Sequence, residues 1–281
     1  MPYFLPGLRF GVGTGHLTLT DQLVVSCPHT GVPRAVQAAD EALAHGIGRL
    51  QQDQWALQSQ LRFAAAARRG LLAGEIVPVM VPGRDGPAEV SQDESPRPDT
   101  TAAKLAGLAT VHGSATVTAG NAPGLSTGAA FLALCAASEA DRRGRPVLGS
   151  IVATAQVAGP PAQIASIPAL AAQAVLRRAG RTLDEVDLLE VNEAFAAVPL
   201  VTTLLLAGGD HAGAAALRER TNVNGGAVAA GHPTGATGAR LVMTICHELR
   251  RRGGGLGLVT MCGGVGEGEA ALVEAGPREA P

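Results

Sequence analysis

The stretch "VDLLEVNEAFAAVPLVTTLLLA" at residues 186–207 predicts a buried β-strand that runs directly into an α-helix. The run "VDLLEV" is short and mostly apolar, which is typical of a strand inside a sheet. The longer apolar run that follows Asn192 favours a helix. A strand followed at once by a helix is the repeating unit of α/β folds, so this stretch predicts a layered α/β domain.

The same alternation continues on both sides of this stretch, from about residue 100 to the end of the chain. Before residue 100 the pattern differs: two helices are expected between residues 34 and 69, then a strand-like "EIVPVMV" and a polar loop at 82–100. Alternating strands and helices predict helices on the faces of one sheet. The other predicted elements are the strand "ATVTAG", the helix "GLSTGAAFLALCAASEADRRG", the strand "VLGSIVATAQVA", the helix "IPALAAQAVLRRAG", the helix "GARLVMTICHELRRRGG", the strand "GLGLVTMC" and the strand "EAALVEA".

The composition favours a cytoplasmic globular protein. The chain has 281 residues, of which 46% are hydrophobic and only 2% aromatic, so small aliphatic side chains must build the core. A formal net charge of −2 without a long basic run argues against nucleic-acid binding. The apolar segment 194–207 is too short to span a membrane. Four widely spaced cysteines form no CxxC pair, which gives a zinc site no support and suits a reducing compartment.

Three polar side chains stand where a predicted strand or glycine-rich loop meets another element, the place where ligands bind in α/β sheets. Asn192 follows a buried strand and either donates to an oxyanion or only caps the next helix. His232 lies in the glycine-rich "AAGHPTGATGA" and is either a site residue or a structural loop histidine. Cys262 ends a strand before four glycines and is either a reactive thiol or an inert small hydrophobe.

The combination of an amide, an imidazole and a thiol indicates chemistry more strongly than any one of them. Each side chain stands at the sheet end of its own segment, and together they form a plausible acyl-transfer site. The cysteines at 135 and 246 fall within predicted amphipathic helices and are expected in the core. Acyl transfer is therefore the predicted chemistry, with Asn192, His232 and Cys262 as its candidate residues.

These segments resemble the three C-terminal signature blocks of the thiolases (acetyl-CoA C-acyltransferases). The blocks are "VNEAFAAV", "NVNGGAVAAGHPTGATGAR" and "MCGGVGEG". Upstream, "QDQWALQSQLRFAAAARRGLLAGEIVPV" resembles the family's helical loop domain, and "TVTAGNAPGLSTGAA" resembles the end of its first half. The resemblance is collinear from about residue 3 to residue 275.

The resemblance implies a thiolase-like layered α/β fold and three regions. Residues 1–100 would be a loop-domain-like segment, residues 101–158 the closing part of the N-terminal domain, and residues 159–281 the complete C-terminal domain. The family reaction is reversible Claisen condensation or thiolysis of acyl-CoA thioesters. Coenzyme A is then a substrate, and neither a metal nor another cofactor is expected. A homo-oligomer, at least a dimer, is also expected.

The resemblance also implies a role for each site residue. His232 would activate a nucleophilic cysteine and join an oxyanion hole, which a water held by Asn192 completes. Cys262 would be the acid/base that moves the α-proton, because proton abstraction beside a thioester needs a base at the carbon and donors at the oxygen. Residues expected at the coenzyme A surface are His29, in an "HTG" like the family's "HMG", together with Asn121 and Gly264.

One expected residue is missing from the pattern. Thiolases carry their acyl-accepting cysteine in a "C-A-S-G"-like turn ahead of the loop domain, and none of the four cysteines here lies in such a turn. Cys27, in "SCPHTG", is only a loose candidate. Pro123 also stands where the family usually has a serine near the pantetheine.

The missing cysteine leaves three explanations. The recorded start is too late, a separate thiolase chain supplies the first half, or the chain is a degenerate relative. We therefore expect poor or no turnover by this chain alone, because the covalent step lacks its thiol. The alternative is a non-catalytic pseudo-thiolase or a partner subunit that binds acyl-CoA or another thiolase chain.

Overall fold

A four-stranded mixed sheet forms the centre of the computed structural model, with strand order β5-β8-β7-β6. The structure describes residues 3–4, 11, 14–16, 20–21, 26–83 and 86–276. Strand β8 pairs antiparallel with both β5 and β7, whereas β6 and β7 are parallel. The strands are β5 (Ser150–Ala158), β6 (Leu188–Val191), β7 (Gly255–Cys262) and β8 (Glu267–Ala275).

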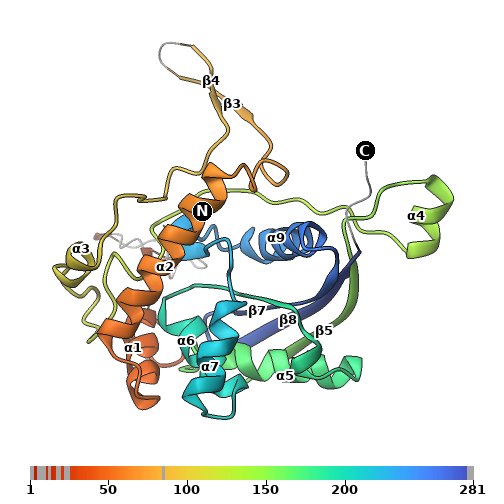
Figure 1. Cartoon of the computed structure of the whole chain (residues 1–281). Helices are drawn as coiled ribbons and strands as arrows, with labels where there is room; N and C mark the ends of the chain where they lie inside the picture. The colour runs from red at the N-terminus through yellow and green to blue at the C-terminus, as the bar shows by residue number, and fades with distance from the viewer. Residues whose placement is uncertain are drawn as a thin grey trace.

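Helices cover both faces of this sheet, as the sequence pattern predicts (Figure 1). Helices α5 (Ile167–Ala179) and α6 (Ala197–Leu206) lie on one face, and α9 (Thr237–Arg251) lies on the other. Their buried residues are mostly alanine, valine, leucine and isoleucine, so the layers are held by small aliphatic side chains. The shorter elements are η2 (Leu183–Glu185), α7 (His211–Glu219) and α8 (Ala227–Ala230).

Two helices of the N-terminal part flank this core. Helix α1 (Arg34–Ala44) packs on α6, and α2 (Arg49–Arg68) packs on α8 and on α3 (Ala102–Ala106). The break between α1 and α2 falls at the "HGIG" segment, where Gly46 adopts a φ of 70° that favours glycine. The predicted pair of helices is therefore confirmed, and α2 reaches the loops at the edge of the sheet.

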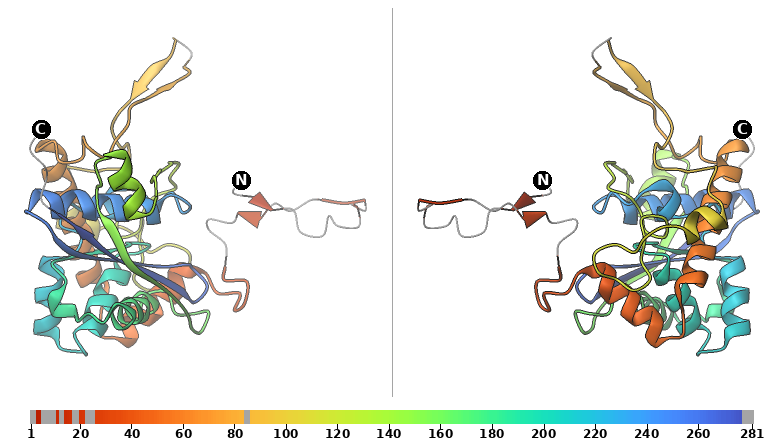
Figure 2. Two further views of the ribbon diagram at one scale, coloured as in Figure 1. Left: turned by 90° about the vertical axis from the view of Figure 1, so that its right-hand side faces the viewer. Right: turned by 90° about the vertical axis from the view of Figure 1, so that its left-hand side faces the viewer.

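The β3–β4 hairpin projects from the body (Figure 2). Strand β3 (Val79–Val81) falls within the predicted strand-like run, and β4 (Ala88–Val90) forms inside the segment predicted as a polar loop. The valines and Met80 of β3 are exposed. Two further short strands, β1 (Tyr3–Phe4) and β2 (Thr20–Asp21), pair with each other away from the body.

The predicted helix over residues 124–144 is largely wrong. Only α4 (Ala137–Arg143) is helical, and the residues before it have no regular structure. A helix in a globular protein depends mainly on the packing of its apolar face, and here Leu125, Phe131 and Leu134 are exposed. Cys135, expected in the core, is exposed as well.

One predicted strand is also wrong. The "ATVTAG" segment forms only an isolated bridge between Thr110 and Thr118 rather than a strand. Strand β5 pairs along its length with β8 in the central sheet. Within the described ranges, no single helix is long and apolar enough to cross a membrane. Helices α6 and α7 together have the length and apolar composition of a membrane span, but the pair is bent by 119°.

Candidate functional site

The ends of the two parallel strands bring Asn192 to a buried position at the edge of the sheet. Its backbone N–H donates to the carbonyl of Thr260 on β7, over 3.0 Å. The side chain is fully buried, and its Oδ1 has no hydrogen-bond partner among the described atoms. Helix α6 begins only at Ala197, so Asn192 does not cap it. The helix-cap interpretation is therefore wrong, and the side chain is available for another role.

His232 lies directly against this amide. The Nδ2 of Asn192 is 3.3 Å from Nε2 of the imidazole. On the other side of the ring, Nδ1 is 2.7 Å from the hydroxyl of Thr237. The backbone N–H of His232 donates to Oγ of Ser126 over 3.0 Å. The two predicted residues are thus in contact, and both ring nitrogens have a partner.

Gly231 lets the chain turn tightly before His232. Its φ of 96° lies in the left-handed region, and a Cβ there would stand 2.6 Å from Oγ of Ser126. The segment that contains Ser126 therefore closes over the histidine turn. A glycine is required here both for the backbone conformation and for the close approach of that segment.

Burial keeps the imidazole of His232 neutral. Desolvation, together with the positive charge of Arg240, lowers its pKa to about 4. Protonation would place a cation in a low-dielectric site beside another cation. A neutral imidazole at pH 7 can act as a proton acceptor.

Cys262 ends strand β7 and is only 7% exposed. Burial raises the pKa of its thiol to about 12, so the group is protonated at neutral pH. The neighbouring Met261 approaches the start of α9: a Cβ on Gly238 would be 3.4 Å from its sulfur. The Cys262 side chain points to the other face and packs in the apolar cluster that includes Ile164, Ala196 and Val198, while the strand itself ends beside the point where Asn192 leaves β6.

We expect this thiol to react slowly with alkylating agents. In native protein at pH 8, iodoacetamide should modify the exposed Cys135 first, and Cys262 and Cys246 much more slowly. Burial also raises the pKa of Cys246, to about 11. Both thiols are therefore protonated at pH 8 and shielded from the reagent. Peptide mass spectrometry over time measures the order. Labelling of Cys262 as fast as Cys135 would contradict its burial and protonation.

Glu193, the residue after Asn192, connects the turn after β6 to neighbouring segments. Its fully buried carboxylate accepts four hydrogen bonds, which fix the turn after β6 to helix α2 and to the start of α8. The donors are Trp55 Nε1 at 2.8 Å, Ser59 Oγ at 2.8 Å, Asn222 Nδ2 at 3.0 Å and the backbone N–H of Val228 at 2.9 Å.

The residues predicted at the coenzyme A surface fall into different environments. His29 is exposed in the turn before α1. Gly264 has a φ of 101°, and its carbonyl accepts a hydrogen bond from Nε of Arg34 over 3.1 Å. Asn121 is fully buried, and both ends of its amide bond to groups inside the fold, among them Asp53. These contacts support a structural role for Asn121.

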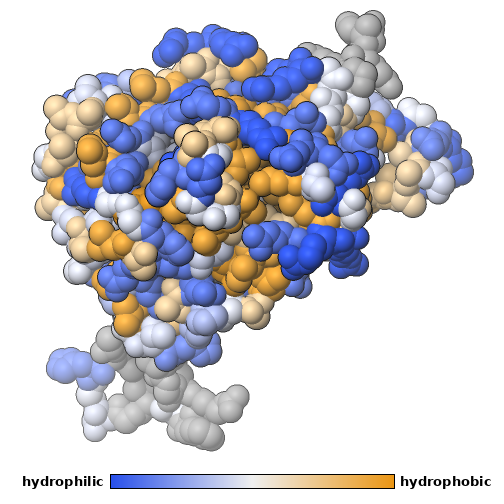
Figure 3. Space-filling model, turned by 60° about the horizontal axis from the view of Figure 1, so that its bottom comes forward, coloured by the Kyte–Doolittle hydropathy of each residue, from blue (hydrophilic) through white to orange (hydrophobic). Residues whose placement is uncertain are grey.

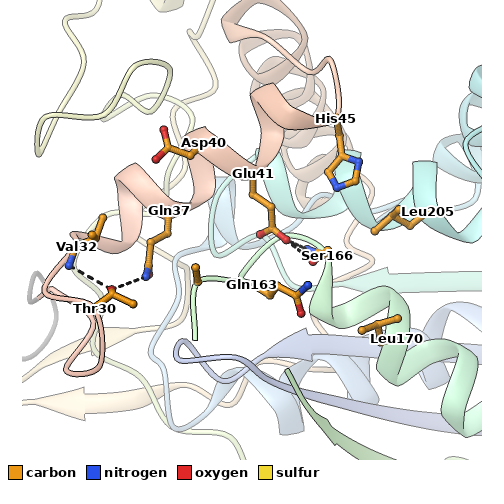
Figure 4. A pocket seen from close by; sticks show the side chains of 11 residues that line it. Thr30, Val32, Gln37, Asp40, Glu41, His45, Gln163, Ser166, Leu170 and Leu205 are labelled. Carbon is orange, nitrogen blue, oxygen red and sulfur yellow. Dashed lines mark hydrogen bonds between the residues drawn. The ribbon is translucent and has the colours of Figure 1, made fainter. Parts of the chain in front are cut away.

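A cavity of about 590 Å³ lies between α1 and α5, away from these residues (Figure 4). Glu41 points across it and accepts hydrogen bonds from the backbone N–H groups of Ile164, Ala165 and Ser166 at the start of α5. None of Asn192, His232 and Cys262 lines it. The carboxylate therefore stabilises the helix N-terminus.

Sequence reasoning missed three residues of this site. Thr237 and Ser126 contact His232, and Glu193 organises the turn beside it. Thr237 stands five residues after His232 in the same glycine-rich stretch, so the sequence alone could have suggested a contact between the two. The other two contacts join segments far apart in the chain, which the sequence pattern does not reveal.

Family models match nearly the whole chain. The model of the thiolase C-terminal domain matches residues 145–275, and that of the thiolase N-terminal domain matches residues 3–138. An acetyl-CoA acetyltransferase of Chromobacterium violaceum is 40% identical over 278 residues, which cover 97% of this chain and 69% of the relative. A beta-ketoadipyl-CoA thiolase of Pseudomonas aeruginosa is 42% identical over 246 residues, covering 87% and 60%.

Solved structures agree with these matches. The acetyl-CoA acetyltransferase of Bacillus anthracis superposes with a TM-score of 0.88 at 35% identity, covering 98% of this chain and 68% of that one. The human mitochondrial 3-ketoacyl-CoA thiolase superposes with a TM-score of 0.84 at 34% identity, over the same shares. The predicted thiolase-like α/β fold is confirmed, and the chain belongs to the thiolase family.

Proposed function

We propose that this protein provides the acid/base half of an acyl-CoA acyltransferase, which catalyses reversible Claisen condensation and thiolysis. His232 accepts the proton of a nucleophilic thiol, and Asn192 holds a water at the oxyanion. Cys262 transfers the α-proton of the acyl group. The contact between Asn192 and His232 and their shared burial support these roles.

The protonation states at rest suit the first step of thiolysis. Cleavage of a 3-ketoacyl thioester leaves an enolate, which needs a proton at carbon. Cys262, whose pKa burial raises to about 12, is a thiol at pH 7 and can give that proton. Its thiolate then takes a proton from the incoming coenzyme A. His232, whose pKa is lowered to about 4, is neutral and can accept the proton of the nucleophile.

The placement of the four cysteines bears on where the nucleophilic thiol comes from. All four lie in described segments, and none of their thiols hydrogen-bonds His232. Cys246 is buried in α9, Cys135 is exposed beside α4, and Cys27 donates to the carbonyl of Pro161 at 4.0 Å. We therefore propose that a thiolase N-terminal segment outside these 281 residues, in the same or a separate chain, supplies the nucleophilic thiol.

Exposed apolar side chains support a covering polypeptide. The unstructured segment before α4 exposes 75% of Leu125 and 87% of Phe131, and the outer strand β5 exposes Ile151 and Val152. Apolar surface also appears on the face drawn in Figure 3. Such surface commonly marks an interface. The same argument supports a homo-oligomer, for which the exposed valines of the β3–β4 hairpin offer a second surface.

Thiolysis of acetoacetyl-CoA by purified protein tests the proposal. We expect almost no turnover with the 281-residue chain alone, and turnover when it is refolded with the first third of the Chromobacterium violaceum relative. His232→Ala and Cys262→Ser should abolish the restored activity, whereas Cys27→Ala should not change it. Activity of the chain alone that is lost in Cys27→Ala would instead identify Cys27 as the nucleophile.

A non-catalytic role is the second candidate, because the same lack of a thiol at His232 would leave a protein that only binds acyl-CoA. Calorimetric titration with acetyl-CoA distinguishes the two. Binding without turnover in every mixture, including those with the complementing polypeptide, favours the binding protein or partner subunit.

A further inference from the structure

Hydrogen bonds connect Pro233, Thr237, His232 and Asn192 in a row, and the donor and acceptor of each bond follow from its neighbours. The hydroxyl of Thr237 donates to the carbonyl of Pro233, over 3.1 Å. Its oxygen lone pairs are then left to face Nδ1 of His232, at 2.7 Å. At the opposite side of the ring, the amide nitrogen of Asn192 is a donor and faces Nε2 at 3.3 Å.

With the Asn192 amide and the Thr237 hydroxyl oriented as in this structure, one tautomer of a neutral imidazole satisfies both neighbours. With its hydrogen on Nδ1, the ring donates to Thr237 and accepts from Asn192. With its hydrogen on Nε2, the ring N–H would face the N–H of the Asn192 amide. The Thr237 hydroxyl would then have to donate to Nδ1 and give up its hydrogen bond to the Pro233 carbonyl. We propose that Thr237 is a positioning residue that holds His232 in the Nδ1–H tautomer, a proposal that rests on the function proposed above.

This tautomer puts the lone pair of the ring on Nε2, which accepts from Asn192 at rest and can accept the proton of the nucleophile once that contact opens. That nitrogen is the one beside Asn192, at the edge where the oxyanion and the nucleophile are proposed to lie. Thr237 is fully buried and is the first residue of α9, so packing fixes its hydroxyl. The low pKa of His232 supports the assignment, because the ring then remains neutral and keeps a single tautomer at pH 7.

Nitrogen NMR of the imidazole tests the tautomer directly. Protein labelled with ¹⁵N-histidine is recorded at pH 7, and loss of one ring system in His232→Gln assigns the signals. We expect a protonated Nδ1 and an unprotonated Nε2 in the unaltered protein. Thr237→Val, which keeps the side-chain shape without an acceptor, should shift the proton toward Nε2. Thr237→Ser, which restores the hydroxyl, should return the original spectrum.

Kinetics of the complemented protein give a second readout. Thr237→Val should lower kcat by about 100-fold with KM nearly unchanged, because proton transfer is impaired and binding is not. A protonated Nε2 in the unaltered protein, or an unchanged tautomer in Thr237→Val, would overturn the proposal. The spectra require no turnover, so failure of thiolysis in every mixture counts against the proposed function alone.

Discussion

Replacing Glu193 with alanine is expected to lower the free energy of unfolding by about 5 kcal/mol, close to the whole stability of many domains. The carboxylate is fully buried and accepts four hydrogen bonds. Its removal leaves a cavity and several buried donors without an acceptor, and each such donor costs about 1–3 kcal/mol. The turn that carries Asn192 should lose its attachment to helix α2.

Urea unfolding followed by circular dichroism measures this loss. Glu89→Ala is the matched control, because Glu89 is exposed on β4 and its removal should change stability by less than about 0.5 kcal/mol. Ser59→Ala removes only one donor and should cost about 1–2 kcal/mol. A Glu193→Ala protein as stable as the Glu89→Ala control would show that the network contributes nothing net.

The elements that the sequence predicts well are those whose local pattern agrees with their packing. Strands β6 and β7 are short, mostly apolar runs with buried side chains, and α9 has one clear apolar face. The site follows from the same pattern, because polar residues that directly follow neighbouring strands meet at one edge. Asn192 follows β6 and Cys262 ends β7, so their place at one edge of the sheet was predictable, whereas His232 lies in the loop between α8 and α9 and its contact with Asn192 comes from the structure.

The parts that the sequence predicts poorly depend on distant segments. The run "GLSTGAAFLALCA" has helical periodicity, but no described element covers its apolar side chains, so it forms no helix. The donors to Glu193 include Trp55, 138 positions away. Nothing in the spacing of "VNEAF" reveals that partner, and the glutamate looks like an ordinary helix-start residue until the structure places α2 beside it.

Replacing Gly226 with alanine should destabilise the protein by about 3–4 kcal/mol through the same carboxylate. A Cβ on Gly226 would stand 2.5 Å from Oε2 of Glu193. The backbone of Gly226 is extended, with a φ of −133°, so contact rather than conformation is the cause. Gly235→Ala is the matched control, because a Cβ there meets nothing within 4 Å. Equal stability of the two variants would contradict the contact.

The cost of this methyl group should depend on Glu193. A glutamate tip normally moves aside at little cost, but this one can move only by breaking its hydrogen bonds to Trp55, Ser59, Asn222 and Val228. Once the carboxylate is gone, the methyl group has room. In the Glu193→Ala protein, Gly226→Ala should therefore cost at least about 2 kcal/mol less than in the unaltered protein. Additive losses in this double-mutant cycle would show that the clash and the network are independent.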